Sequence, residues 1–186
     1  MLRTIITCSI LVWLFCGLGC RSRQAGNVRQ SDSASSQSNA SQIRAVIPID
    51  QGGLAKLIKE RNGRTLVLNL WATWCAPCVE EFPDLVKLAK SYSEQEVEVV
   101  GISADYPDEV ESKIMPFLRR QGVPFMVYVA DFQSQQDFIN GVNSSWSGAL
   151  PATLVFDKQG KQRSFLVGEG TYDKFRKMVD SAKVAP

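Results

Sequence analysis

The sequence contains no histidine among its 186 residues. Mechanisms that need a histidine general base, and metal sites with imidazole ligands, are therefore excluded. Net charge is also low, because 21 Lys and Arg face 19 Asp and Glu, for a net charge of +2. This balance does not indicate a nucleic-acid-binding protein. Hydrophobic residues make up 45% of the chain, which is enough to build the core of one ordinary domain.

Cysteine is sparse and unevenly placed. Three of the five cysteines, Cys8, Cys16 and Cys20, lie near the N-terminus, and Cys75 and Cys78 form a C-x-x-C pair. A disulfide-stapled scaffold would scatter its cysteines along the fold, so this distribution argues against one.

The N-terminus has the layout of a bacterial export signal. A short basic start is followed by an apolar run over 5–18, shorter than the roughly 20 residues of a membrane-spanning helix. The run ends in Gly17-Leu18-Gly19-Cys20, which resembles a lipobox, although Gly17 stands where an aliphatic residue is usual. We expect a signal over 1–19 and lipidation at Cys20. An uncleaved anchor and ordinary signal cleavage are the alternatives.

Residues 20–42 are rich in Ser, Gln, Asn and Ala and nearly lack large apolar side chains. Such a segment cannot bury enough surface to offset the entropy of ordering it. It is expected to be a flexible tether between a membrane anchor and a folded domain over 43–186. A spacer without function would have the same composition.

The patterns after residue 43 predict alternating strands and helices. Strands are expected at 43–47, 65–71, 97–102, 125–129, 152–156 and 163–167, and helices at 54–61, 79–91, 108–121, 133–139 and 172–183. Pro116 is expected to kink or divide its helix. The last two strands pair across a turn at 157–160. This order predicts an α/β fold with a mixed sheet.

Cys75 and Cys78 directly follow a strand predicted to be buried and stand at the start of a helix. Free N–H groups and partial positive charge at a helix N-terminus favour a thiolate. Cys75 is therefore expected to attack a substrate disulfide and Cys78 to resolve the mixed disulfide. A zinc ribbon would need a second ligand pair, and a structural disulfide closing so short a loop would remove little entropy from the unfolded chain.

The segment around the cysteines resembles the TlpA/ResA branch of the thioredoxin superfamily, which comprises membrane-tethered bacterial thiol-disulfide oxidoreductases. That branch carries a W-C-x-P-C-x-x-E-x-P pattern, and its fixed positions are matched by Trp74, Cys75, Pro77, Cys78, Glu81 and Pro83. The resemblance covers roughly 43–186. It implies a thioredoxin-like fold: a central mixed sheet flanked by helices, with an insert between the active-site strand–helix unit and the cis-proline hairpin. It implies neither a cofactor nor a metal.

The resemblance also implies roles for residues outside the cysteine pair. Pro151 matches the cis-proline beside the cysteines, and it would form a substrate groove with Leu150, Trp74, Pro77 and Trp146. Trp146 is equally compatible with a packing role.

Glu81 stands three residues after Cys78, on the same helix face. In this branch such a glutamate handles the protons of the cysteines, whereas Asn69 replaces the buried Asp of cytosolic thioredoxins. A partly buried Glu81 would have a raised pKa and relay a proton. The alternative is a solvated surface glutamate.

By analogy, the protein would be an extracytoplasmic reductant of protein disulfides, with apocytochrome c as a candidate substrate and a membrane protein as electron donor. A disulfide-forming oxidase differs only in reduction potential, which sequence does not determine. A peroxiredoxin-like peroxidase is less favoured, because those enzymes use a T-x-x-C loop. A non-catalytic tethered binding module is disfavoured by the intact Cys75/Cys78 pair.

Overall fold

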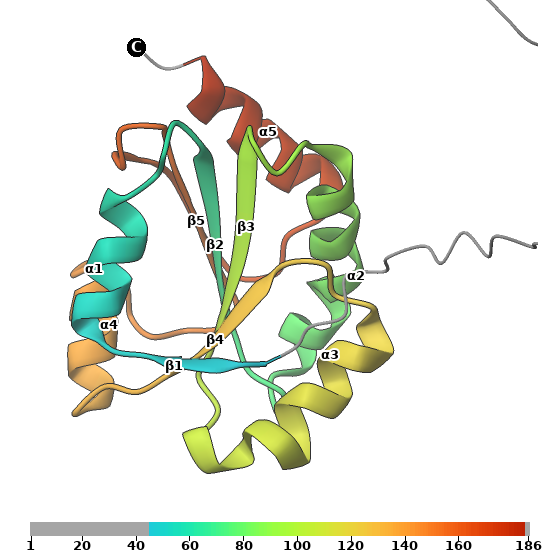
Figure 1. The fold of residues 1–186 in the computed structure, drawn as a ribbon, viewed down its shortest axis with the longest axis vertical. Coiled ribbons are helices and arrows are strands. Elements are labelled where there is room, and N and C mark those ends of the chain that lie inside the picture. Colours follow the sequence, from blue (N-terminus) through green and yellow to red (C-terminus); the bar gives the residue numbers. More distant parts are fainter. Residues whose placement is uncertain (1–44, 185–186) are drawn as a thin grey trace, which may run out of the picture. The chain divides into compact units, whose positions relative to one another are not determined.

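The computed structural model describes residues 45–184, which form a six-stranded sheet with helices on both faces (Figure 1). The expectations for the signal, for Cys20 and for the tether lie outside these residues. Strand order is β1-β4-β3-β2-β5-β6. Strands β1 to β4 are parallel along the sheet, and β5 and β6 run antiparallel to their neighbours. The expected α/β fold with a mixed sheet is confirmed.

The elements follow the predicted order. The strands are β1 Ile47–Ile49, β2 Thr65–Trp71, β3 Val97–Ser103, β4 Met126–Ala130, β5 Ala152–Phe156 and β6 Gln162–Val167. The helices are α1 Gln51–Lys59, α2 Ala76–Ser91, the short η1 Pro107–Glu109 and η2 Val110–Ile114, α3 Met115–Gln121, α4 Gln135–Val142 and α5 Tyr172–Lys183. Across residues 45–184, no helix has both the length and the apolar character needed to cross a membrane.

Strand β2 lies at the centre of the sheet and is buried along its whole length. Since successive side chains of a strand point to opposite faces, Leu66, Leu68 and Leu70 join the cluster under α1 and α4. Val67 and Trp71 join the cluster under α2, α3 and α5. The polar Asn69 lies between them on the same face, so it points toward α2.

Side-chain caps mark the starts of α1 and α4. Helix α1 begins earlier than expected because the Asp50 side chain accepts the backbone N–H of Gly53 at 2.7 Å. Helix α4 begins at residue 135, after Ser134 accepts the N–H of Asp137. Strand β1 covers Ile47–Ile49, where it makes three pairs with β4, and overlaps the predicted range 43–47 only at Ile47; residues 43 and 44 lie outside the described residues.

The helix expected over 108–121 is divided into three parts, in line with the expected effect of Pro116. A 3₁₀ turn and a π turn precede α3, and the N–H of Met115 donates to the carbonyl of Val110. Pro116 then falls in the first turn of α3, where its missing N–H leaves no helical hydrogen bond unmade.

Antiparallel pairing between β2 and β5 defines the edge where the site forms. Asn69 is the register partner of Thr153. The carboxyl end of β2, which leads to the cysteines, therefore lies beside the amino end of β5, which follows Pro151. The segment 104–149, between β3 and β5, contains α3, β4 and α4, and it forms the expected insert.

Candidate active site

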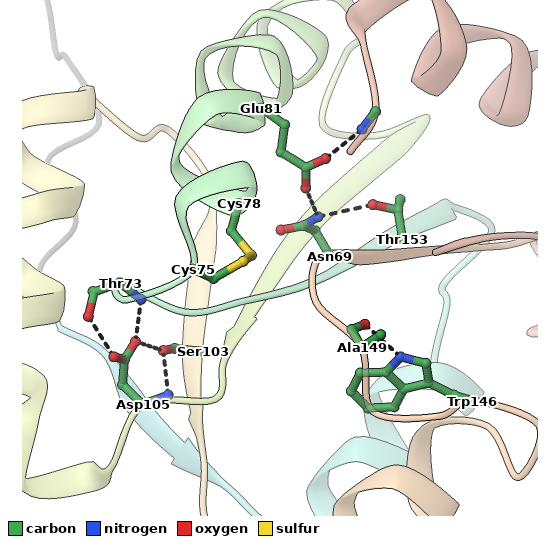
Figure 2. The surroundings of a disulfide bond; sticks show 11 residues. Asn69, Thr73, Cys75, Cys78, Glu81, Ser103, Asp105, Trp146, Ala149 and Thr153 are labelled. Carbon is green, nitrogen blue, oxygen red and sulfur yellow. Dashed lines mark hydrogen bonds between the residues drawn. A yellow bond between two sulfur atoms is a disulfide. The ribbon is translucent and has the colours of Figure 1, made fainter. Parts of the chain in front are cut away.

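Cys75 and Cys78 form a disulfide at the start of α2, with their Cα atoms 5.3 Å apart (Figure 2). Cys75 is the N-cap residue, and Pro77 lies in the first turn. The side chain of Cys75 is 6% exposed and that of Cys78 is fully buried. An attacking substrate or reductant therefore meets Cys75 first.

Glu81 lies one turn after Cys78 and is only 1% exposed, which excludes a solvated surface glutamate. Its carboxylate accepts hydrogen bonds from the Asn69 amide at 2.8 Å and from the backbone N–H of Gly170 at 2.7 Å (Figure 2). Burial raises the pKa of Glu81 from 4.5 to about 7, against the opposing effect of these two donors. Both protonation states are therefore populated near neutral pH.

Asn69 connects the helix carboxylate to the cis-proline hairpin. Its side-chain nitrogen donates to Glu81 and, at 3.0 Å, to the hydroxyl of Thr153. Its Oδ1 is buried and has no hydrogen-bond partner among residues 45–184. The sequence marks Asn69 as a replacement for Asp, but it did not reveal Thr153 and Gly170 as neighbours. The pairing of β2 with β5 is the signal that places Thr153.

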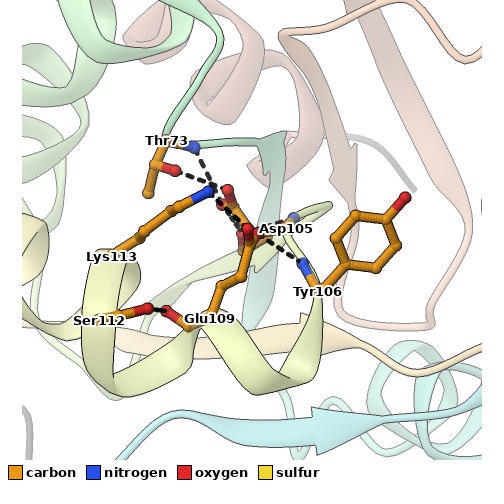
Figure 3. A network of polar contacts seen from close by, with 7 residues as sticks. Thr73, Asp105, Tyr106, Glu109, Ser112 and Lys113 are labelled. Atoms are coloured by element: carbon orange, nitrogen blue, oxygen red, sulfur yellow. Dashed lines mark hydrogen bonds and ion pairs between the residues drawn. The ribbon is translucent and has the colours of Figure 1, made fainter.

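A second polar network holds the loop before Cys75. The carboxylate of Asp105 accepts the backbone N–H of Thr73 at 2.9 Å and its hydroxyl at 2.6 Å, and it also accepts the hydroxyl of Ser103 (Figures 2 and 3). The sequence patterns assigned no role to Asp105. Because Trp71 is the register partner of Ser103, the segments after β2 and β3 must lie together.

Helix η1 extends this network away from the cysteines. Glu109 accepts the backbone N–H of Tyr106 at 3.2 Å and pairs with Lys113 at 2.5 Å (Figure 3). These two contacts hold the turn after Asp105 in place. Tyr106 remains 73% exposed.

The Leu150–Pro151 peptide bond is cis. Before it, Trp146 is buried, packs edge-on against Phe138 and donates its Nε1–H to the carbonyl of Ala149 at 2.9 Å (Figure 2). Its burial and ring contact agree with a packing role. Trp146 also lines a cavity together with Leu150 and Trp74, and its role in a substrate groove stays a prediction. Trp74 is 66% exposed. Pro77 is exposed as well, but it is not part of that cavity.

A buried strand, a C-x-x-C disulfide at a helix N-terminus and an adjacent cis-proline define a thioredoxin-like thiol-disulfide oxidoreductase. The sequence profile of the AhpC/TSA family matches residues 44–164. The chain therefore belongs to that family, and it is a TlpA/ResA-like member of the thioredoxin superfamily.

Individual relatives agree with this assignment. The thiol-disulfide oxidoreductase ResA of Geobacillus thermodenitrificans (strain NG80-2) is 28% identical over 134 residues, 72% of each chain. Among solved structures, a thiol:disulfide interchange protein from Chlorobium tepidum TLS is 26% identical with a TM-score of 0.56, covering 66% of this chain and 81% of that one. A thioredoxin-related protein from Neisseria meningitidis serogroup B is 29% identical with a TM-score of 0.56, covering 63% and 84%.

Proposed function

We propose that this enzyme reduces disulfides of exported polypeptides, with Cys75 as the attacking and Cys78 as the resolving cysteine. The observation that carries the proposal is the unequal burial of the pair at the start of α2. Cys75 keeps 6% of its surface exposed, whereas Cys78 is fully buried, three residues before the buried Glu81. An attacking thiolate needs access, whereas a resolving thiol needs only to reach its neighbour.

The reaction begins from the dithiol. The Cys75 thiolate bonds to one sulfur of the substrate disulfide, and the other sulfur leaves and takes up a proton. Cys78 then attacks Cys75, which forms the observed disulfide and releases the second substrate thiol. Two electrons and two protons pass from the enzyme to the substrate, and a donor dithiol restores the starting state.

Glu81 serves as the proton relay in the second step. Cys78 is fully buried, so its proton needs an acceptor inside the protein as Cys78 attacks. The pKa of Glu81, raised by burial to about 7, lets it accept and return a proton near neutral pH. Asn69 and Gly170 keep the carboxylate in place by donating to it.

The proposed location is extracytoplasmic. The basic start and apolar run of 1–19 support an export signal, Cys20 supports a lipid anchor, and 20–42 would tether the domain over 43–186. In this arrangement a membrane protein supplies the electrons, and cysteine pairs of apocytochrome c are a candidate substrate. Replacing Cys20 by Ser should release the protein from the membrane fraction without changing its reductase activity.

The test is insulin reduction by dithiothreitol with the full chain. Wild type should accelerate it and Cys75→Ser should not, while Cys78→Ser should accumulate a mixed disulfide visible by mass spectrometry. Equal rates for wild type and Cys75→Ser would overturn the proposal.

The reduction potential of the Cys75–Cys78 couple reports the direction of electron flow. A value of about −270 mV supports a reductant, and a value of about −120 mV supports an oxidase. Faster turnover with hydrogen peroxide than with insulin would favour the peroxidase alternative.

A further inference from the structure

A cavity of about 400 Å³ opens beside the cysteine pair and is not explained by the redox chemistry. We name it the insert pocket. Its apolar lining comes from the residue before Cys75, the residue before the cis-proline, and the insert, and it includes Trp74, Leu150, Tyr106, Phe132, Phe138 and Trp146. A polypeptide whose disulfide reacts at Cys75 must therefore pass the mouth of this pocket.

The insert pocket has a buried floor and an exposed aromatic rim. Phe138 and Trp146 are buried and pack edge-on at 5.6 Å. Trp74 and Tyr106 leave most of their surface in water, although large aromatic side chains gain most when a partner covers them. The pocket is thus built to receive an apolar side chain.

The charged residues around the insert pocket indicate which polypeptides it favours. Asp105 and Asp131 line the insert pocket. A neighbouring hollow that shares Asp131 and Phe132 adds Asp50 and Asp137. Within the described part of the chain, no Lys or Arg lines either of the two hollows. A third hollow, which also shares Asp50 and Asp131, contains Lys56 and Arg64, but these pair with Glu60 and Glu98. On a protein of net charge +2, the aspartates therefore form a local acidic field that favours a basic partner.

We propose that the insert pocket selects substrates: it binds a polypeptide that carries a large apolar side chain next to the reacting cysteine and a Lys or Arg close by. The apolar side chain enters between Trp74 and Tyr106, and the basic side chain pairs with the exposed Asp131. This inference rests on the proposed function, since it assumes that the substrate disulfide reacts at Cys75.

The test uses the full-length protein and two synthetic peptides, each closed by one disulfide and carrying Phe next to a cysteine. The peptides differ only in an Arg or a Glu after the Phe. The measured quantity is the ratio of kcat/KM for the Arg peptide to that for the Glu peptide, which does not depend on how much of a preparation is active. For wild type at low salt we expect a ratio of about ten, which falls as salt screens the charges.

Asp131→Lys should lower this ratio to about one or below. The side chain of Asp131 is exposed, and its backbone N–H donates to the carbonyl of Ile49 at 3.0 Å, a bond that the substitution leaves in place. The matched control is Glu94→Lys, which makes the same charge change on an exposed residue before β3, at the opposite end of the parallel strands. The ratio of this variant should equal that of wild type.

The apolar part is tested with a second peptide pair, in which Phe is kept or replaced by Gly. Tyr106→Ala should reduce the preference for the Phe peptide by about threefold or more. Wild-type ratios near one in both pairs, with both peptides reduced, would overturn the insert-pocket proposal and leave the proposed function standing. Failure of wild type to reduce any of the four peptides or insulin would overturn the proposed function itself.

Discussion

Replacement of Glu81 by Gln tests the energetic cost of a buried carboxyl group. Burial raises the pKa of Glu81 to about 7, compared with 4.5 in water. Between these pH values the folded chain keeps a proton that the unfolded chain has released. The free energy of unfolding therefore falls as the pH rises from 4.5 to about 7, and this contribution is level above that.

The size of this change in the free energy of unfolding follows from the difference between the two pKa values. Each factor of ten in proton affinity corresponds to about 1.4 kcal/mol, so the move from 4.5 to about 7 corresponds to about 3 kcal/mol. Glu81→Gln removes the titration and keeps one amide oxygen to accept from Asn69 or Gly170. Wild type should therefore lose about 3 kcal/mol of stability relative to this variant between about pH 4 and about pH 8.

Urea unfolding of the disulfide-bonded protein, followed by circular dichroism, measures both proteins across this range. Glu80→Gln is the matched control, because Glu80 is the exposed neighbour on the same helix. It should follow the wild-type pH dependence. If the curves of wild type and Glu81→Gln run parallel from pH 4 to 8, burial does not raise the pKa of Glu81 and the proposed relay loses its basis.

Two further substitutions test the surroundings of the cysteine pair. Asp105→Asn gives up acceptor capacity for the N–H and hydroxyl of Thr73, so it should destabilise the fold by about 1–3 kcal/mol in urea unfolding; an unchanged midpoint would contradict a role in holding the loop. Gly170→Ala would place a Cβ 2.2 Å from the Phe175 ring; because Phe175 is fully buried, we expect the backbone at Gly170 to shift and its N–H to move away from Glu81. The NMR titration of the Glu81 carboxyl carbon should then move to higher pH, and an unmoved midpoint would refute this coupling.

The sequence predicted strands and helices best where pattern and burial coincide. The bounds of β2, β5 and α5 agree with their predicted ranges, because a continuous apolar run, a hairpin turn and a clear amphipathic period define them. Strand β1 was misplaced, since three residues at a sheet edge carry little pattern and their pairing with β4 decides their extent. The π turn before Pro116 depends on local helical pitch, which side-chain periodicity does not encode.

In the active site, too, local spacing could be predicted from the sequence, whereas contacts between distant segments could not. The cysteines and Glu81 lie in one seven-residue stretch, 75–81, so spacing alone relates them. Asp105 is 32 residues from its partner Thr73, and only the pairing of β2 with β3 brings the two together. The insert pocket likewise combines side chains from distant segments, and the sequence suggested only Trp74, Leu150 and Trp146 of its lining.

The redox chemistry and the proposed substrate selection are carried by different parts of the chain. The cysteines, Glu81 and Asn69 are supported by β2, α2 and β5, whereas most of the insert pocket is supplied by the segment 104–149. Substitutions on α4 or in the loops around it can change which polypeptide binds without altering the electron-transfer centre. The same redox core can therefore serve different substrate polypeptides through changes on α4 and in the loops around it.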